Sequence, residues 1–203
     1  MTSSPGDPLR LPLASARPER ADAARNRRRV LAAAQRLFAD HGPAGVSLEA
    51  VAREAGVGKA TLFRRFPDRH ALIAALLDEH ERELQDALLA GPPPLGPGAP
   101  PLERALAFLD RLLDVSLAHL ELLLASETAK PLARQHTGAY AAWHLHLTTL
   151  ARALRPDADT GLLAHQLLAP FDAELLRRQL DEGADQPALQ AALRDLTRRA
   201  LAP

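Results

Sequence analysis

The sequence contains no cysteine. It therefore has no disulfide, no thiolate metal site and no thiol nucleophile. Aromatic residues make up only 3% of its 203 residues, and leucine and alanine far outnumber the β-branched residues. Because leucine and alanine favour helices whereas β-branched and aromatic residues favour strands, this composition predicts an all-α fold.

The sequence also lacks any apolar run near the roughly 18 residues that a membrane span requires, and its N-terminus has no hydrophobic signal-peptide region. We therefore expect a cytoplasmic protein with no membrane partner. The net charge is zero, but residues 1–80 contain 13 Lys and Arg against 9 Asp and Glu, whereas residues 81–203 contain 12 against 16. A basic N-terminal part joined to an acidic C-terminal part is the asymmetry expected of a nucleic-acid binder with a partner domain.

The most informative stretch is residues 47–66, SLEAVAREAGVGKATLFRRF, which has the pattern of a helix-turn-helix motif. Ser47 is a predicted N-cap, and Gly56 ends a helix whose apolar face is formed by Leu48, Val51, Ala52 and Ala55. A second short helix follows Gly58. In this motif the second helix enters the major groove of DNA, although an ordinary helical hairpin with a basic surface would show much of the same pattern.

The flanking segments predict two longer helices. One covers residues 21–41 and is ended by Gly42 and Pro43; the other covers residues 69–90 and is capped by Asp68. Residues 1–20, rich in Pro, Ser, Ala and Arg, are expected to form a mostly disordered tail. Arginines in this tail and at positions 25 and 27–29 could reach a phosphate backbone or a minor groove, but a solvated basic tail would have the same composition.

Arg69 is unusual because it lies in the first turn of a predicted helix, where a cation opposes the helix macrodipole. A phosphate against that helix N-terminus would explain its position. An ordinary exposed arginine is an equally good interpretation from the sequence alone.

Residues 25–77 resemble the N-terminal DNA-binding domain of the TetR family of bacterial transcriptional regulators. The resemblance is carried by Leu37-Phe38-Ala39, His41-Gly42, Ser47-Leu48, Val51-Ala52, Ala55-Gly56-Val57, Lys59-Ala60-Thr61-Leu62-Phe63 and Phe66-Pro67-Asp68-Arg69. It covers about a quarter of the chain without gaps.

The resemblance implies a three-helix DNA-binding domain that a fourth helix joins to an all-helical domain for ligand binding and dimerisation. By position, Ser47 and Arg69 would contact phosphate, while Gly58, Lys59, Thr61 and Arg64 would face the major groove or its walls. Phe63 stands where the family usually has tyrosine, so one hydroxyl donor to the DNA backbone is missing. This difference should weaken affinity more than specificity.

The remaining chain predicts a second helical domain. Residues 91–101, GPPPLGPGAPP, form a Pro/Gly-rich linker that cannot be helical. The expected organisation is thus a tail (1–20), a DNA-binding domain with its linking helix (21–90), the linker (91–101) and a ligand-binding and dimerisation domain (102–203). Helices are expected over 102–126, 138–154, 160–182 with a kink at Pro170, and 187–201.

A ligand pocket is predicted inside this second domain, because the 102–126 helix is apolar nearly all round. Tyr140, His144 and Thr148 share one helix face and could orient a ligand, although they could equally lie at the surface or satisfy one another. The full set of candidate lining residues is Phe108, Leu112, His119, Tyr140, Trp143, His144, Leu147 and Thr148.

Two leucine- and alanine-rich stripes predict a dimer interface near the C-terminus, although each stripe could serve only the core of its own chain. The resemblance implies a four-helix bundle formed by two helices from each subunit. The stripe residues are Leu162, Ala169, Ala173, Leu176, Leu180, Leu189, Leu193 and Leu196.

No cofactor, metal site or catalytic residue is predicted. His144 and His146 lie two positions apart on a helix and point to different sides, so they cannot easily share an ion. The sequence has no nucleophile elbow, phosphate-binding loop or helical HExxH motif.

We therefore expect a homodimeric, sequence-specific regulator that binds a palindromic operator in double-stranded DNA and is most simply a repressor released by a small-molecule effector. One alternative is a helical ligand-binding or interaction protein that no longer reads DNA; a second is an enzyme in the C-terminal domain. Phe63 and the zero net charge favour the first alternative, whereas Lys59, Thr61, Arg64 and Arg69 argue against it.

Overall fold

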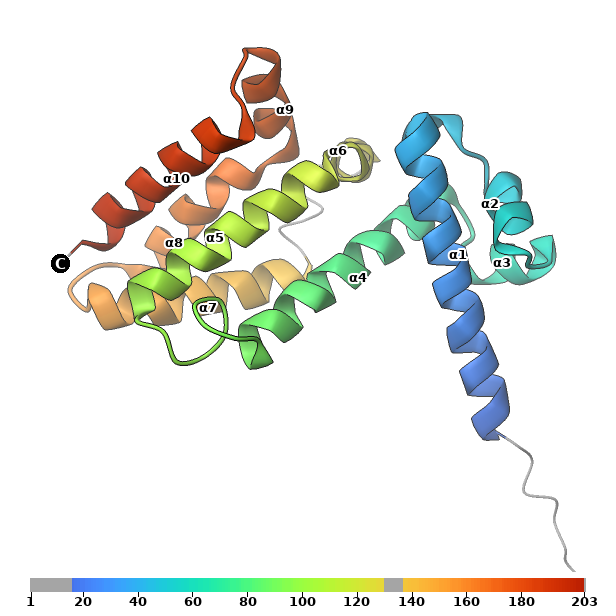
Figure 1. The fold of residues 1–203 in the computed structure, drawn as a ribbon, viewed down its shortest axis with the longest axis horizontal. Coiled ribbons are helices and arrows are strands. Elements are labelled where there is room, and N and C mark those ends of the chain that lie inside the picture. Colours follow the sequence, from blue (N-terminus) through green and yellow to red (C-terminus); the bar gives the residue numbers. More distant parts are fainter. Residues whose placement is uncertain (1–15, 130–136, 203) are drawn as a thin grey trace, which may run out of the picture.

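The computed structural model describes residues 16–129 and 137–202, and over these ranges the chain is built from helices with no strand. The all-α prediction is therefore confirmed. Figure 1 shows two groups of helices joined by the long helix α4. The elements are α1 (Ala16–Gly45), α2 (Leu48–Ala55), α3 (Lys59–Arg65), α4 (Arg69–Ala90), α5 (Pro101–Ala118), α6 (Leu120–Ala129), α7 (Gly138–Leu154), α8 (Thr160–Leu168), the 3-10 turn η2 (Ala169–Phe171), α9 (Ala173–Asp181) and α10 (Gln186–Leu201).

The helix-turn-helix motif has the predicted local structure. The Ser47 hydroxyl accepts the Ala50 N–H at 3.1 Å and so caps α2. Gly56 ends α2 with φ 62° and ψ 41°, and the N–H groups of Gly56 and Val57 donate to carbonyls of the preceding turn at 3.2 and 3.0 Å. These two bonds form a Schellman motif, whose left-handed residue is normally glycine.

Helix α1 is longer than predicted at both ends. It begins at Ala16 rather than near residue 21, so residues 16–20 are helical rather than a tail. Alanine, arginine and glutamate favour the helix there, and Pro18 lies in the first turn, where its missing N–H breaks no bond. At the other end Gly42 (φ 70°, ψ 158°) kinks the chain, and a last helical turn with Pro43 continues to Gly45.

Two predicted helices of the C-terminal half are each divided in the structure. The 102–126 helix breaks at His119, where α5 ends and α6 begins. The 160–182 helix is not merely kinked at Pro170: η2 interrupts it, and Asp172 caps the new helix α9 by accepting the Leu175 N–H at 2.9 Å. The predicted linker forms the non-helical segment between α4 and α5, and α5 starts at Pro101.

The described residues form two hydrophobic cores. The N-terminal core lies among α1, α2, α3 and the first half of α4, and the C-terminal core lies among the end of α4 and helices α5 to α10. Helix α6 belongs to both, because Leu122 and Ala125 pack into the N-terminal core whereas Leu120 and Leu123 pack into the C-terminal core. Burial on both sides explains why the chain turns at His119 without any Gly or Pro signal.

Candidate nucleic-acid interface and effector region

Helix α3 presents a basic surface and buries its apolar side. Leu62 and Phe66 are 1% and 4% exposed in the N-terminal core, as the motif requires. Lys59, Thr61 and Arg64, together with Gly58 just before the helix, are exposed. The structure thus brings the predicted groove-facing residues together on one open surface.

The cations of this surface have no internal counter-charge. Lys59, Arg64 and Arg65 form no hydrogen bond or ion pair within the described part of the chain, and each is exposed. Phe63 lies among them with 37% of its surface exposed, an unusual position for a phenyl ring. Unpaired cations around an exposed ring favour contact with a phosphate backbone and its sugars.

Arg69 has a local role that its sequence position does not reveal. Its Nη1 donates to the carbonyl oxygen of Ala44 at 3.0 Å, so the side chain ties the start of α4 to the end of α1. The hydrogen bond offsets the unfavourable placement of a cation at a helix N-terminus. Its presence there therefore does not require a bound phosphate, and its contact with DNA stays a prediction.

Half of the predicted pocket residues form packed core. Phe108 and Leu112 of α5 are fully buried, and Trp143 and Leu147 of α7 are 3% and 1% exposed. The cavity beside them, between α4, the α5–α6 break and α7, has a volume of only about 20 Å³ and is lined by residues that include His119 and Trp143. This volume holds about one water molecule, so a larger ligand requires side chains to move.

The predicted polar face of α7 packs against α8 and not against this cavity. The Tyr140 hydroxyl lies 2.9 Å from Nδ1 of His165, and Nε2 of His144 donates to the Gly161 carbonyl at 3.0 Å. Oγ1 of Thr148 is buried without a hydrogen-bond partner among the described residues. Tyr140 and His144 therefore satisfy groups of α8 rather than one another.

Two further histidine contacts were not predicted. His80 of α4 stacks on His119 with ring centroids 3.8 Å apart, and His146 meets the edge of Phe108 with centroids 5.2 Å apart. Burial, reinforced by the neighbouring His80, lowers the pKa of His119 to about 4, although Glu83 acts in the opposite direction. Burial and the nearby Arg104 likewise lower the pKa of His146 to about 4.

These two pKa values predict acid-sensitive stability. Each ring is neutral in the fold, whereas the unfolded chain takes up a proton below about pH 6.5, so stability falls as pH drops from about 6.5 towards 4. The free energy of unfolding should therefore fall between pH 7 and pH 5. We expect this fall to be smaller by about 1 kcal/mol in H119Q, a figure that allows for partial screening of the His119 ring by water. Urea unfolding at both pH values measures this difference, with H70Q, at an exposed position, as the control.

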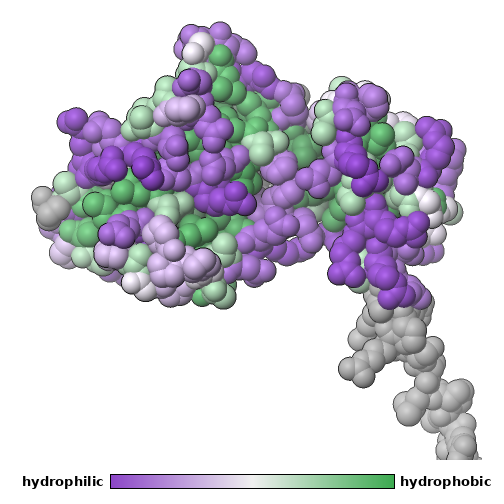
Figure 2. Space-filling model, in the orientation of Figure 1, coloured by the Kyte–Doolittle hydropathy of each residue, from purple (hydrophilic) through white to green (hydrophobic). Residues whose placement is uncertain are grey.

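The predicted dimer residues separate into three classes by burial. Ala173, Leu176 and Leu193 are buried in the C-terminal core, so most of the surface of these side chains serves their own chain. Leu180 and Leu189 are half-buried against the same core. Leu162, Ala169 and Leu196 remain exposed, and Figure 2 shows apolar surface gathered over the C-terminal helices.

Among the residues with defined positions, no cluster of three or more His, Asp or Glu side chains could hold a metal ion. Over the same residues, no helix combines the length and the apolar character needed to cross a bilayer.

Comparison with known proteins identifies the N-terminal helices. Residues 30–76 match the model of the bacterial regulatory proteins of the tetR family. An uncharacterised helix-turn-helix transcriptional regulator of Mycobacterium tuberculosis is 41% identical over 56 residues, which is 28% of this chain and 28% of that protein. The chain thus matches little more than a quarter of the length of its curated relatives.

Similarity of fold extends over most of the chain. A TetR-family regulator from Pectobacterium atrosepticum covers 90% of this chain and 97% of its own, with a TM-score of 0.68 and 20% identity. A protein of Saccharomonospora viridis, solved in complex with choline, covers 85% and 95%, with a TM-score of 0.67 and 22% identity. Residues 30–76 thus carry the N-terminal signature of the tetR family of bacterial regulatory proteins, and most of the chain has a fold similar to that of TetR-family structures.

Proposed function

We propose that the protein is a homodimeric, sequence-specific DNA-binding transcriptional regulator, and that it represses until a small-molecule effector releases it. The observation that carries the proposal is the exposed, unpaired basic surface of α3 on a helix-turn-helix scaffold. In this function α3 occupies the major groove, where Lys59, Thr61 and Arg64 contact bases or groove walls, and Ser47 and Arg69 contact phosphate.

The two cores correspond to two proposed domains. Residues 21–90 would form the DNA-reading domain with its linking helix α4, residues 91–101 the linker, and residues 102–203 the effector and dimerisation domain. The effector would enter where His119 and Trp143 border the 20 Å³ cavity, pushing core side chains apart. Choline is bound by a neighbour of similar fold, which supports a small-molecule site without identifying this chain's effector.

Helix α6 offers the physical connection between effector and DNA. A ligand that opens the cavity would press on Leu123, which lines it, and α6 also carries Leu122 of the N-terminal core. The dimer would have two conformations, one with its two DNA-binding domains spaced to fit the operator and one without. A ligand can shift the equilibrium between these conformations only by its difference in affinity for them. Dimerisation would use the exposed Leu162, Ala169 and Leu196, joined at their edges by Leu180 and Leu189, and its two-fold axis would require a palindromic operator.

Fluorescence anisotropy with a duplex from the protein's own upstream region tests the function directly. A scrambled duplex of equal length serves as the control, and both are titrated over a salt series. We expect tighter binding to the upstream duplex at every salt concentration, because base contacts persist when phosphate attraction is screened. Equal, salt-sensitive binding to every candidate operator would instead favour a helical ligand-binding protein that no longer reads DNA.

A further inference from the structure

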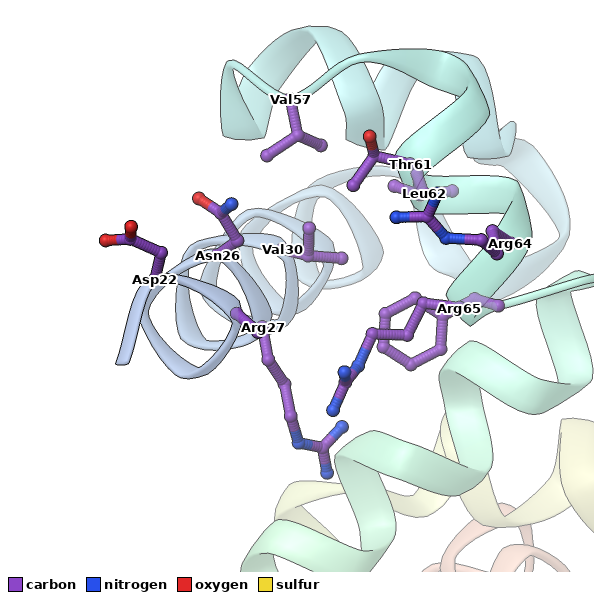
Figure 3. Close-up of a pocket in the computed structure, with 11 residues that line it drawn as sticks. Asp22, Asn26, Arg27, Val30, Val57, Thr61, Leu62, Arg64 and Arg65 are labelled. Carbon is purple, nitrogen blue, oxygen red and sulfur yellow. The ribbon is translucent and has the colours of Figure 1, made fainter. Parts of the chain in front are cut away.

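A cavity of about 480 Å³ lies between the N-terminal half of α1 and helix α3 (Figure 3). We call it the α1–α3 groove. Its apolar wall is formed by Val30, Val57 and Leu62, and its charged lining consists of Asp22, Arg27, Arg64 and Arg65. Three guanidinium groups against one carboxylate make the groove suitable for an anion that also has an apolar part.

The arginines approach this space from two different helices. Figure 3 shows Arg27 of α1 and Arg65 of α3 extending toward the same end of the groove. Arg65 has no ion-pair partner among the described residues, and Arg64 has none either. The planar guanidinium group of arginine forms bidentate hydrogen bonds with phosphate oxygens. Two such groups on opposite walls of the groove can bind one phosphodiester.

Arg27 is held only weakly in the free protein. Its Nη2 lies 3.7 Å from Oε2 of Glu79 on α4, near the limit for an ion pair, and Arg82 shares the same carboxylate oxygen at 3.5 Å. A phosphate entering the groove would therefore compete with Glu79 for Arg27. Glu79 directly precedes His80, whose ring stacks on His119 at the α5–α6 break.

The groove is continuous with the proposed reading surface, because Thr61 and Arg64 belong to both. We propose that the α1–α3 groove holds a sugar–phosphate strand of the bound DNA, with Arg27 and Arg65 clamping a phosphodiester and the sugar resting on the apolar wall. The inference rests on the proposed function and adds a sequence-independent anchor beside the major-groove contacts. Glu79 acts as a competitor that lowers DNA affinity.

The salt dependence of DNA binding tests the clamp. R65A should bind both the upstream and the scrambled duplex about tenfold more weakly, and the slope of log K against log salt should become shallower by about 0.9 for the lost phosphate contact. The preference between the two duplexes should not change. R111A, which removes an exposed arginine from α5, is the matched control and should leave affinity and slope unchanged.

A second pair of variants tests the competitor. E79Q should tighten binding to both duplexes about threefold, because Arg27 is released to the phosphate. D86N removes the same charge from an exposed position of α4 without contacting Arg27, and it should bind less tightly than E79Q. Thermal unfolding of each variant shows whether the fold is intact, as expected for an exposed Asp86 and a half-buried Glu79.

The outcomes separate this inference from the proposed function. If the wild-type protein shows no duplex preference, the proposed sequence-specific binding fails. The salt dependence of binding to the scrambled duplex, compared between wild type and R65A, still tests whether the groove contacts phosphate. Equal slopes for wild type, R65A and R111A would overturn the clamp. A free mononucleotide that binds wild type but not R65A, with duplex slopes unchanged, would also overturn it and would make the groove a small-anion site.

Discussion

The G56V variant is expected to lose operator binding by at least roughly tenfold and to destabilise the protein by about 2 kcal/mol. Gly56 has φ 62°, a left-handed conformation that a β-branched residue adopts only under strain. A Cβ atom there would also lie 2.7 Å from Nη2 of Arg29, which donates to the Gly56 carbonyl at 3.4 Å. The exposed Arg29 guanidinium can move aside and lose this hydrogen bond, but relief of the strained φ would change the angle between α2 and α3, and hence the docking of α3.

Chemical denaturation and operator titration measure the two effects separately. G183V is the matched control, because Gly183 also has a positive φ of 98° but a Cβ there meets no atom within 4 Å, and it lies between α9 and α10. It should lose stability and keep operator affinity. Equal losses of affinity in both variants would mean that general destabilisation, and not the turn geometry, governs DNA binding.

The F108A variant should lower the free energy of unfolding by about 3 to 5 kcal/mol. Phe108 is fully buried in the C-terminal core, with 0% solvent exposure, and its ring meets His146 edge-on. Truncation removes this buried area and leaves a cavity that a close-packed core cannot fully fill. Urea unfolding monitored by circular dichroism provides the measurement.

F63A makes the same chemical change at an exposed ring of α3 and is the control. Its stability should change by less than about 1 kcal/mol, because little buried area is lost. A loss in F108A no greater than that in F63A would show that the α5 core tolerates a cavity. Such tolerance would favour a C-terminal core that opens readily for an effector.

Local sequence signals were sufficient for helices α2, α3 and α4, although not for the ends of α1. Ser47, Gly56 and Asp68 act within one turn of their own helices, so the boundaries of α2 and α4 follow from capping chemistry alone. The burial of Leu62 and Phe66 likewise follows from helical periodicity, which leaves the cations of α3 outside. The candidate DNA-binding surface could thus be predicted residue by residue, although its adjoining groove could not, because α1 and α3 meet only in three dimensions.

The C-terminal half was less predictable because its decisive contacts are long-range. Nothing near His119 signals a break, which depends on Leu122 reaching the other core. Similarly, an apolar stripe does not reveal how deeply Leu176 and Leu193 are buried in their own core, and here both are almost fully buried. The Tyr140 side chain was predicted to border a ligand, but its position depends on how closely α8 packs.

The sharing of α6 between the two cores limits how this protein can be recombined. A DNA-reading domain that ends with the linking helix is interchangeable only if no later helix contributes to its core. Here a chimera joined at residue 91 would lack Leu122 and Ala125, leaving a hole in the N-terminal core and an exposed apolar surface. A functional chimera must therefore include α6 with the DNA-binding domain, or change the residues on both sides of that contact together.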